Sequence, residues 1–392
     1  MSRNDDSGSG TVGTERWGFD TGDPIEQLAA ADGTLYVGSG RHLHAVSATD
    51  GTEQWHAFTN GTSRPAVTAG TVYVGGRKGG LRAIDTVTGE EQWRFETGGP
   101  IHGSPTAASG TVYLGSNDDH LYAVDATTGE EQWRFAADGG IATSPTVADG
   151  TVYAGGYDDH LYAIDAATGE EQWHLVTDGP VVGSPAVADG TVYAPSEDGT
   201  LYVLAATTGE EQWRFETRRN LRSPPAVSGG AVYFGGDDGH LYAVAANSGE
   251  ERWRFETDLY VRAGPTIAAG TVYVGSHDGH LYAVAANSGE ERWRFETDSR
   301  VKATPAVAGG SVYVGGTDGT LYALRASDDA ALPGDQPSTD RVASEGDESK
   351  GLPEDESETG KLDDRDRCRE CGGDLSPLDD PAFCPDCGTE LN

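Results

Sequence analysis

Four cysteines near the C-terminus have the spacing of a metal site. Cys368 and Cys371 form one Cys-x-x-Cys pair, Cys384 and Cys387 form a second, and a glycine follows each pair. Two such pairs can present four thiolates to Zn²⁺ in a tetrahedron, and the glycines permit tight turns whose amides bond the sulfurs. Because all four positions are cysteine, we expect a closed, structural zinc site.

Residues 368–392 resemble a short zinc ribbon. A segment of this size has too little core to fold alone, so metal binding would supply its folding energy. The closeness of the two pairs makes rubredoxin-like iron the weaker alternative, and a reducing cytoplasm disfavours disulfides. Many zinc ribbons bind nucleic acid, but this segment carries six acidic residues against one arginine, Arg369. A protein contact is therefore the expected role.

A repeat governs the rest of the chain. One unit, beginning at residue 141, contains four short β-like runs separated by the turn signals "DG", "YDDH" and "ATGE". Short connections make neighbouring strands antiparallel, so each unit should be a four-stranded meander. Tryptophans recur at intervals of 38, 38 and then 40 residues, at Trp17, Trp55, Trp93, Trp133, Trp173, Trp213, Trp253 and Trp293.

Such sheets bury both faces when copies stack in a ring. The first tryptophan strand, residues 15–21, has no repeat before it, and the last unit, residues 304–326, stops before its tryptophan strand. The first strand can therefore fill the vacancy in the last unit. We predict an all-β fold: an eight-bladed β-propeller of four-stranded antiparallel blades over residues 15–326, with the N-terminal strand closing the last blade.

The repeat resembles a known family. Ala123, Asp125, Thr128, Gly129 and Trp133 have the pattern A-x-D-x-x-T-G-x-x-x-W, which is similar to the tryptophan-docking motif of the pyrroloquinoline-quinone (PQQ) repeat propellers. The chain looks like a PQQ-like propeller of the halophilic-archaeal type, and the Trp-Asp pair of WD-type repeats is missing. The family includes quinoprotein alcohol and glucose dehydrogenases, a bacterial outer-membrane assembly lipoprotein and many non-enzymes, so the resemblance does not establish a bound quinone.

The tryptophans are expected to be structural. Eight near-equivalent side chains cannot all serve one active site, whereas each ring offers a large apolar face to the next blade. Gly129 and its equivalents suit a turn with positive φ. In blades five to seven the aspartate of the motif becomes Ala205, Ala245 and Ala285, so a turn-bracing hydrogen bond should be lost there.

One position, three residues before the proline that opens each innermost strand, carries cations in three consecutive blades. In propellers of this family the entry to these strands would face the channel mouth. A small anionic ligand or an acidic partner segment is one hypothesis, and pairing with nearby Asp and Glu is the alternative. Arg218, Arg219 and Arg300 lie close in sequence. The position three residues before the proline is occupied, in successive blades, by Thr62, His102, Ala142, Val182, Arg222, Arg262 and Lys302.

The turns "NDDH", "YDDH", "DDGH", "HDGH" and "TDGT" are acidic in most blades. Clustered carboxylates suit calcium, but a tight hairpin turn with a solvated acidic surface is the favoured interpretation. A PQQ-dependent dehydrogenase is a weaker hypothesis than a non-enzyme. The propeller has no cysteine for the disulfide of the alcohol-oxidising branch, and no single acidic residue stands out from the repeat as a base.

Charge and composition narrow the function classes. The net charge is −37, which molar salt would screen, so we expect a salt-adapted, halophilic protein that binds neither nucleic acid in general nor anionic membranes. No targeting or membrane-spanning segment is apparent, so a cytoplasmic location is expected. Residues 1–14 should be disordered, and residues 327–367, rich in acid, Pro and Gly, should form a flexible linker.

These observations together favour a cytoplasmic, non-enzymatic scaffold: a monomeric propeller that binds a protein partner and carries a tethered zinc ribbon. A PQQ-dependent dehydrogenase and a nucleic-acid-associated factor acting through the ribbon are the alternatives. Zinc is the expected cofactor, and PQQ is not expected.

Overall fold

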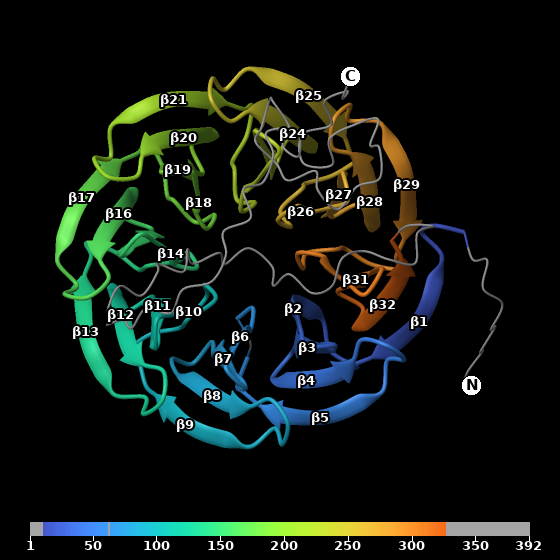
Figure 1. Cartoon of the computed structure of the whole chain (residues 1–392), viewed down its shortest axis with the longest axis horizontal. Coiled ribbons are helices and arrows are strands. Elements are labelled where there is room, and N and C mark those ends of the chain that lie inside the picture. Colours follow the sequence, from blue (N-terminus) through green and yellow to red (C-terminus); the bar gives the residue numbers. More distant parts are fainter. Residues whose placement is uncertain (1–10, 62, 327–392) are drawn as a thin grey trace, which may run out of the picture. The chain divides into compact units, whose positions relative to one another are not determined.

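Short apolar runs separated by glycine-containing turns form a ring of eight four-stranded antiparallel sheets (Figure 1). The computed structural model describes residues 11–61 and 63–326. Within these ranges there are 32 strands and no helix. No helix in the described part of the chain is therefore long and apolar enough to cross a bilayer.

Each blade places its first strand next to the channel and its last strand at the rim (Figure 1). The innermost strands are β2 (Ile25–Ala31), β6 (Ala66–Thr68), β10 (Thr106–Ala108), β14 (Thr146–Ala148), β18 (Ala186–Ala188), β22 (Ala226–Ser228), β26 (Thr266–Ala268) and β30 (Ala306–Ala308). The second strands are β3 (Thr34–Ser39), β7 (Thr71–Gly75), β11 (Thr111–Ser116), β15 (Thr151–Gly155), β19 (Thr191–Pro195), β23 (Ala231–Gly235), β27 (Thr271–Gly275) and β31 (Ser311–Gly315).

The third strands are β4 (His42–Ser47), β8 (Leu81–Asp85), β12 (His120–Asp125), β16 (His160–Asp165), β20 (Thr200–Ala205), β24 (His240–Ala245), β28 (His280–Ala285) and β32 (Thr320–Arg325). The outer strands are β5 (Glu53–Phe58), β9 (Glu91–Phe95), β13 (Glu131–Ala136), β17 (Glu171–Val176), β21 (Glu211–Glu216), β25 (Glu251–Glu256), β29 (Glu291–Glu296) and, for blade 8, β1 (Glu15–Asp20).

Burial explains the composition of each strand. All six residues of β11 are buried, because neighbouring blades cover both faces of the second strand. The outer strand β13 instead alternates exposed and partly buried residues, and so has the hydrophobic-in, polar-out pattern of a half-buried strand. The continuous apolar runs and the alternating tryptophan runs thus mark different radii of the ring.

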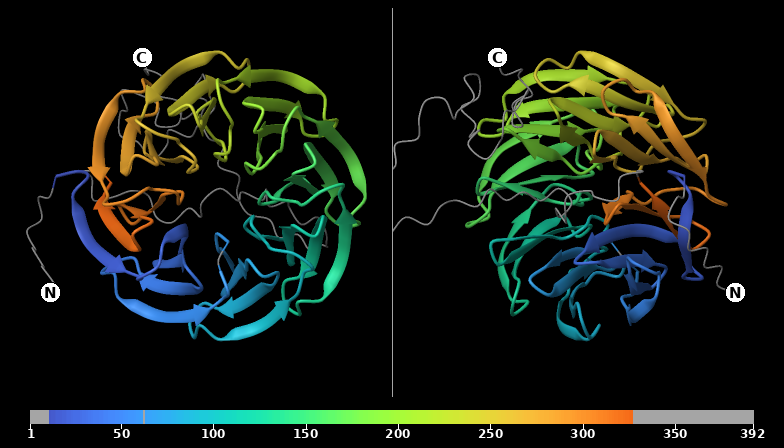
Figure 2. Two further views of the ribbon diagram at one scale, coloured as in Figure 1. Left: turned by 180° about the vertical axis from the view of Figure 1, so that it is seen from behind. Right: turned by 45° about the vertical axis from the view of Figure 1, so that its right-hand side comes forward.

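The first strand closes the ring, as the unpaired tryptophan strand and the incomplete last repeat predict. β1 pairs antiparallel with β32, and Trp17 lies opposite Ala323 (Figure 2). The Gly13 amide also donates to the Arg325 carbonyl at 2.9 Å, and Gly13 lies against the Trp293 ring. Gly13 therefore packs on the ring, although the sequence predicted residues 1–14 to be disordered.

The apolar core is divided among the blade interfaces. One buried cluster joins Tyr113, Leu121 and Ala123 of blade 3 to Val152 and Ile164 of blade 4. Equivalent clusters lie at each of the other interfaces, including the one between blades 8 and 1. Stability therefore depends on contacts between neighbouring blades, as in other repeat proteins.

A row of three residues crosses each blade toward its rim. In blade 3, Tyr113 pairs with Ala123, and Ala123 pairs with Trp133. The small alanine leaves room for the two rings, whose centroids lie 5.8 Å apart. This aromatic pair forms part of the surface that packs on blade 4.

Candidate functional site

One end of the ring carries the loops that differ most between blades. The turns between second and third strands lie there, together with the connections from each outer strand to the next innermost strand. The Asp237 amide donates to the Asn220 carbonyl at 3.0 Å, and the His277 amide donates to the Tyr260 carbonyl at 3.0 Å. We call this end the loop face. The turns between third and outer strands lie at the opposite end.

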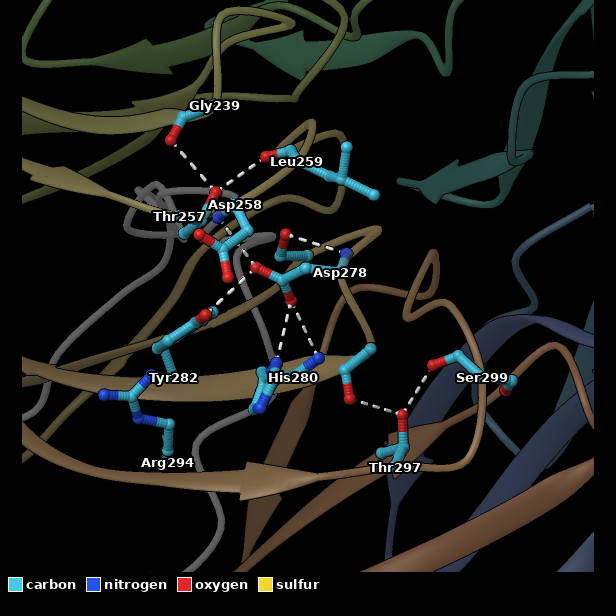
Figure 3. Close-up of polar contacts among 12 residues, drawn as sticks. Gly239, Thr257, Asp258, Leu259, Asp278, His280, Tyr282, Arg294, Thr297 and Ser299 are labelled. Carbon is cyan, nitrogen blue, oxygen red and sulfur yellow. Dashed lines mark hydrogen bonds and ion pairs between the residues drawn. The ribbon is translucent and has the colours of Figure 1, made fainter.

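A buried aspartate braces most turns of the loop face (Figure 3). In blade 7, Asp278 Oδ2 accepts hydrogen bonds from Tyr282 Oη at 2.9 Å and from the Asp258 amide at 3.1 Å, and Oδ1 accepts one from the His280 amide at 2.9 Å. The Asp278 side chain is 5% exposed. We call this arrangement the Asp–Tyr brace. The other pairs are Asp118–Tyr122, Asp158–Tyr162, Asp198–Tyr202, Asp238–Tyr242 and Asp318–Tyr322.

The brace corrects the expectation of a solvated acidic turn. The hairpin turns are present, but the side chains of Asp158, Asp238 and Asp278 are only 5–6% exposed, because tyrosine hydroxyls and backbone amides supply donors there. Asp318 of blade 8 stays exposed. Burial and the bond to aspartate raise the pKa of Tyr122 and of Tyr202 to about 12. Within residues 11–61 and 63–326, no three His, Cys, Asp or Glu side chains gather in a way that could hold a metal ion.

Two arginines of the predicted cation position share one carboxylate. Arg262 Nε and Nη2 donate to Asp237 Oδ1 and Oδ2 at 2.6 and 2.8 Å. Arg222 Nε donates to Glu197 Oε1 at 2.8 Å, and its Nη1 lies 3.8 Å from Asp237 Oδ2. The Asp237 side chain is only 10% exposed. Side-chain oxygens of Glu197 and Asp237 therefore already occupy donors of both guanidinium groups.

Blade 1 contributes an acid to the same position. Ile25 packs on Gly315 as Val301 packs on Gly275, so Glu26 is the counterpart of Lys302. Lys302 Nζ lies 3.9 Å from Glu26 Oε1. Glu26 also forms an ion pair with Arg77.

Among the described residues, the remaining members of the predicted position form no second cationic cluster. Burial, and then the charge of Arg77, lower the pKa of His102. Ala142 and Val182 bear no charge, and Thr62 lies outside the described residues. The structure thus brings Arg222 and Arg262 together, and places Lys302 beside Glu26 and His102 near Arg77. Sequence reasoning missed Glu26, Glu197 and Asp237, the acids that accompany these cations.

Arg222 and Arg262, two of the cations predicted at the channel mouth, do not fit PQQ, which carries three carboxylates. A carboxylate ligand entering at Arg222 and Arg262 would have to displace Glu197 and Asp237, and it would meet their negative charges. The four cysteines of the predicted zinc site, Cys368, Cys371, Cys384 and Cys387, lie outside the described residues.

A buried histidine adjoins this network. Nε2 of His277 is buried and has no hydrogen-bond partner in the part of the chain that the structure describes. Burial, and then the charges of Arg262, Lys302 and Arg300, lower the pKa of His277, against a smaller opposing effect of Asp237. His277 is therefore neutral at pH 7 in a cationic surrounding.

An exposed patch lies beside the network, and we call Arg218, Arg219, Leu259 and Tyr260 the blade 6–7 patch. Leu259 and Tyr260 are 46% and 37% exposed, and they line a hollow of about 210 Å³ with Arg219. Asp237, Asp238 and Asp258 line the same hollow. The Arg262 guanidinium lies 4.8 Å from the centre of the Tyr260 ring, a cation–π distance. Neither Arg218 nor Arg219 makes a side-chain ion pair or hydrogen bond with another described residue.

The tryptophans have a structural role, separate from the residues of the loop face. Trp133 Nε1 donates to the Ala166 carbonyl of the next blade at 3.0 Å, and the ring lies against Gly169. Five more make the equivalent hydrogen bond: Trp55, Trp93, Trp173, Trp213 and Trp253. Trp17 and Trp293 pack on Gly51 and Gly13. All eight side chains hold neighbouring blades together.

Comparisons with known proteins agree with this architecture. The family model described as outer membrane protein assembly factor BamB matches residues 9–100, 39–144, 88–184, 128–257 and 237–332. No curated protein matches the chain.

Several solved structures share the fold. BamB from Moraxella catarrhalis has a TM-score of 0.70 and 21% identity, with 80% of this chain and 100% of that chain covered. The quinohemoprotein alcohol dehydrogenase from Comamonas testosteroni has a TM-score of 0.69 and 18% identity, with 88% and 79% covered. A europium-containing methanol dehydrogenase has a TM-score of 0.70 and 14% identity, with 80% and 93% covered.

Proposed function

The chain belongs to the PQQ-like repeat family whose model is described as outer membrane protein assembly factor BamB, and on that premise we propose that its ring is a non-enzymatic scaffold that binds a protein partner. The partner contacts the loop face at the blade 6–7 patch. The similar structures include both an assembly factor and quinone-type dehydrogenases, so the shared fold does not distinguish a scaffold from a dehydrogenase.

The observation that carries the proposal is the composition of the blade 6–7 patch. The exposed Tyr260 ring, the exposed Leu259 and Arg219, which has no side-chain partner among the described residues, line one hollow. Arg218 directly precedes Arg219 in the chain. Tyrosine and arginine are enriched in the small groups of residues that dominate the energy of protein interfaces. Arg218 and Arg219 stand where the next connections have Asp258 and Leu259, or Asp298 and Ser299, so the patch is a local departure from the repeat.

The chemistry of the patch also suggests the partner. The guanidinium groups of Arg218 and Arg219, which form no ion pair with a described residue, suit an acidic residue of the partner, and Leu259 with Tyr260 suits an apolar anchor. A partner segment that combines an acidic residue with an aliphatic or aromatic one would use both. The partly buried Arg262–Asp237 pair beneath Tyr260 holds that ring in place.

Cross-linking in the cells that make the protein tests this proposal. We expect a defined partner to be cross-linked to the wild-type chain and its yield to fall at least about tenfold in Arg219→Ala/Tyr260→Ala, the loss of one charged and one aromatic contact. Val87→Ala is the control, because Val87 is 82% exposed in a turn of the opposite face. Equal yields from wild type and the double variant would refute the proposal.

The dehydrogenase hypothesis rests on the fold shared with the two dehydrogenases. Its test is dye-linked oxidation of alcohols and sugars after addition of PQQ and calcium. Turnover that is lost in Arg222→Ala/Arg262→Ala would favour this alternative over the scaffold.

The C-terminal segment adds a second part to the proposal. We propose that Cys368, Cys371, Cys384 and Cys387 bind one structural zinc ion, and that the chain acts in the cytoplasm as a monomer. Native mass spectrometry at high salt would report zinc, any quinone and any partner together. A chelator should remove one zinc ion from the wild type and none from Cys371→Ser/Cys387→Ser; retention of the chain on DNA or RNA at molar salt would favour the nucleic-acid alternative.

A further inference from the structure

Blade 2 lacks the Asp–Tyr brace at the loop face. Lys78 stands where blades 3 to 8 have the aspartate, and Arg82 stands where they have the tyrosine. Both members of the pair are changed to cations at once, although blade 2 keeps the same strands and the same pairing of β7 with β8. The change therefore alters the side chains of the turn and of the start of β8, while the pairing of the strands is kept.

The altered turn borders a hollow of about 130 Å³, which we call the blade 2 hollow. Lys78, Arg82, Arg94 and Glu96 line it together with Gly79 and Gly80. A volume of this size holds a few water molecules or one small ion. The side chain of Arg82 is 17% exposed and that of Arg94 is 58% exposed, so the hollow has one cation near its floor and another at its opening.

The charges of the hollow are only partly compensated. Arg82 pairs with Glu91, and Arg94 Nε lies 3.4 Å from Glu91 Oε1. Arg94 Nη1 is 4.0 Å from Glu96 Oε1, the limit of an ion pair. Lys78 makes no ion pair or side-chain hydrogen bond with another residue that the structure describes. Three cations therefore face two carboxylates, and the Lys78 ammonium is uncompensated.

The surrounding loops are also unlike those of the other blades. Residues 59–65 and 76–80 contain no acidic residue, whereas every turn between second and third strands in blades 3 to 8 contains at least one. In a chain of net charge −37, these two loops contribute no carboxylate of their own, and the acids near them lie in neighbouring strands or directly after one. Such a region attracts anions more strongly than the rest of the surface.

We propose that the blade 2 hollow binds an oxyanion, either a free phosphate ion or a carboxylate of an acidic peptide. The Lys78 ammonium donates to the oxyanion, and Arg82 and Arg94 supply further positive charge around it. Glu96, whose carboxylate lines the hollow, competes with the ligand and swings outward when it binds. This site is separate from the blade 6–7 patch, so it stands or fails independently of the proposed scaffold function.

Titration calorimetry of the full chain with inorganic phosphate and with triglutamate tests the site, and amide NMR signals of Gly79 and Gly80 locate it. We expect at least one probe to bind and to shift both signals. Lys78→Ala should weaken binding about tenfold, the effect of one charge-assisted hydrogen bond. Glu96→Gln should strengthen it about fivefold, because a like charge is removed beside the ligand.

Two further variants act as matched controls. Lys78→Asp/Arg82→Tyr installs the brace of blades 3 to 8, so it should fold like the wild type and bind neither probe. Arg300→Ala removes one positive charge from the same face outside the hollow and should leave binding unchanged.

The probe that binds identifies the source of the oxyanion: phosphate indicates a small ion, and triglutamate indicates an acidic segment. The proposal is overturned if neither probe binds the wild type. It is also overturned if Lys78→Asp/Arg82→Tyr binds as the wild type does, or if Arg300→Ala weakens binding as much as Lys78→Ala. If the double variant fails to fold, the two single variants test the proposal: weaker binding by Lys78→Ala together with stronger binding by Glu96→Gln supports it, and any other combination overturns it.

Discussion

The indole Nε1 of Trp133 donates a 3.0 Å hydrogen bond to the carbonyl oxygen of Ala166 in the next blade. The hydroxyl of Tyr113 donates to the same oxygen at 3.1 Å. The tryptophan ring lies over Gly169, where an added Cβ would come within 2.7 Å of Cδ2. The interface between blades 3 and 4 therefore combines two hydrogen bonds to one acceptor with a contact that only glycine permits.

Gly169→Ala should destabilise the ring more than Gly150→Ala does. Both glycines have φ of +74°, so each alanine costs about 1–2 kcal/mol for the left-handed backbone. Gly150 has nothing within 4 Å of an added Cβ, whereas Gly169 would also clash with Trp133, for about 1–3 kcal/mol more. Urea denaturation at fixed molar salt measures both, and equal midpoints would disprove the tryptophan contact.

Ala205→Asp should stabilise the ring. Asp125 Oδ1 accepts hydrogen bonds from the Thr127 and Thr128 amides at 2.9 and 2.8 Å, and Ala205 occupies the same position before a similar turn in blade 5. The variant should raise the thermal midpoint at pH 7. The reciprocal change, Asp125→Ala, should lower it, and the argument fails if the two variants shift the midpoint in the same direction.

The same aspartates predict an acid-dependent loss of stability. Hydrogen bonds from the Thr128 and Thr127 amides lower the pKa of Asp125, and equivalent bonds lower the pKa of Asp85 and Asp165. A carboxylate with a lowered folded-state pKa stabilises the fold above its unfolded pKa of about 3.9 and loses that contribution as the pH falls through the lowered value. The gain from Ala205→Asp should therefore vanish in strong acid, which thermal midpoints measured across that range would show.

The Asp–Tyr brace predicts unfolding at alkaline pH. The pKa of Tyr122 and of Tyr202 is raised to about 12, so these hydroxyls keep their protons above the usual value of about 10. Their stabilising contribution is complete below about pH 10 and is lost as the pH rises toward 12. Near-ultraviolet absorbance should show phenolate forming together with loss of the fold, and Tyr202→Phe should unfold less steeply with pH. Phenolate that forms fully in the intact ring near pH 10 would contradict the brace.

His277 predicts a separate loss of stability in mild acid. Its pKa is lowered in the folded ring, so the unfolded chain takes up a proton near pH 6.5 that the folded chain refuses. Stability should fall as the pH decreases below about 6.5. His277→Asn, which copies Asn117 of blade 3, should remove this dependence, and parallel stability curves for variant and wild type would show that His277 does not contribute.

The fold could be predicted from the sequence because the residues that form each blade interface recur in successive repeats. The spacing of Trp133 from Trp173 gave the period, the turn signals gave the meander, and the unmatched Trp17 strand gave the closure. The packing of Gly13 on the ring was not predicted. "TVGTERW" at 11–17 is a degenerate copy of "TTGEEQW" at 127–133, and the signal was therefore present but weak.

The site was predicted less completely, since the sequence showed the cations without their partners. Arg222 and Glu197 are 25 positions apart, and so are Arg262 and Asp237. Because the spacing is the same in both blades, the sequence could have shown that each arginine has an acid 25 residues before it. The contact of Lys302 with Glu26 depends on ring closure, which brings blade 8 beside blade 1. The double change at Lys78 and Arg82 was also visible in the sequence, because both residues differ from the aspartate and the tyrosine that blades 3 to 8 carry at these positions.

The closure of the ring by β1 has a consequence for synthesis and assembly. Thr21 Oγ1 donates to the Gly319 carbonyl, 298 positions later, so β1 must remain without its partner strand until the last blade emerges. From that point until β1 and β32 have paired, both present an open edge to strands of other chains. Two incomplete rings can exchange their first strands at no loss of pairing, which is the geometry of a strand-swapped dimer. Folding at high chain concentration should therefore favour such dimers, and a circular permutant in which β1 directly follows β32 should avoid them.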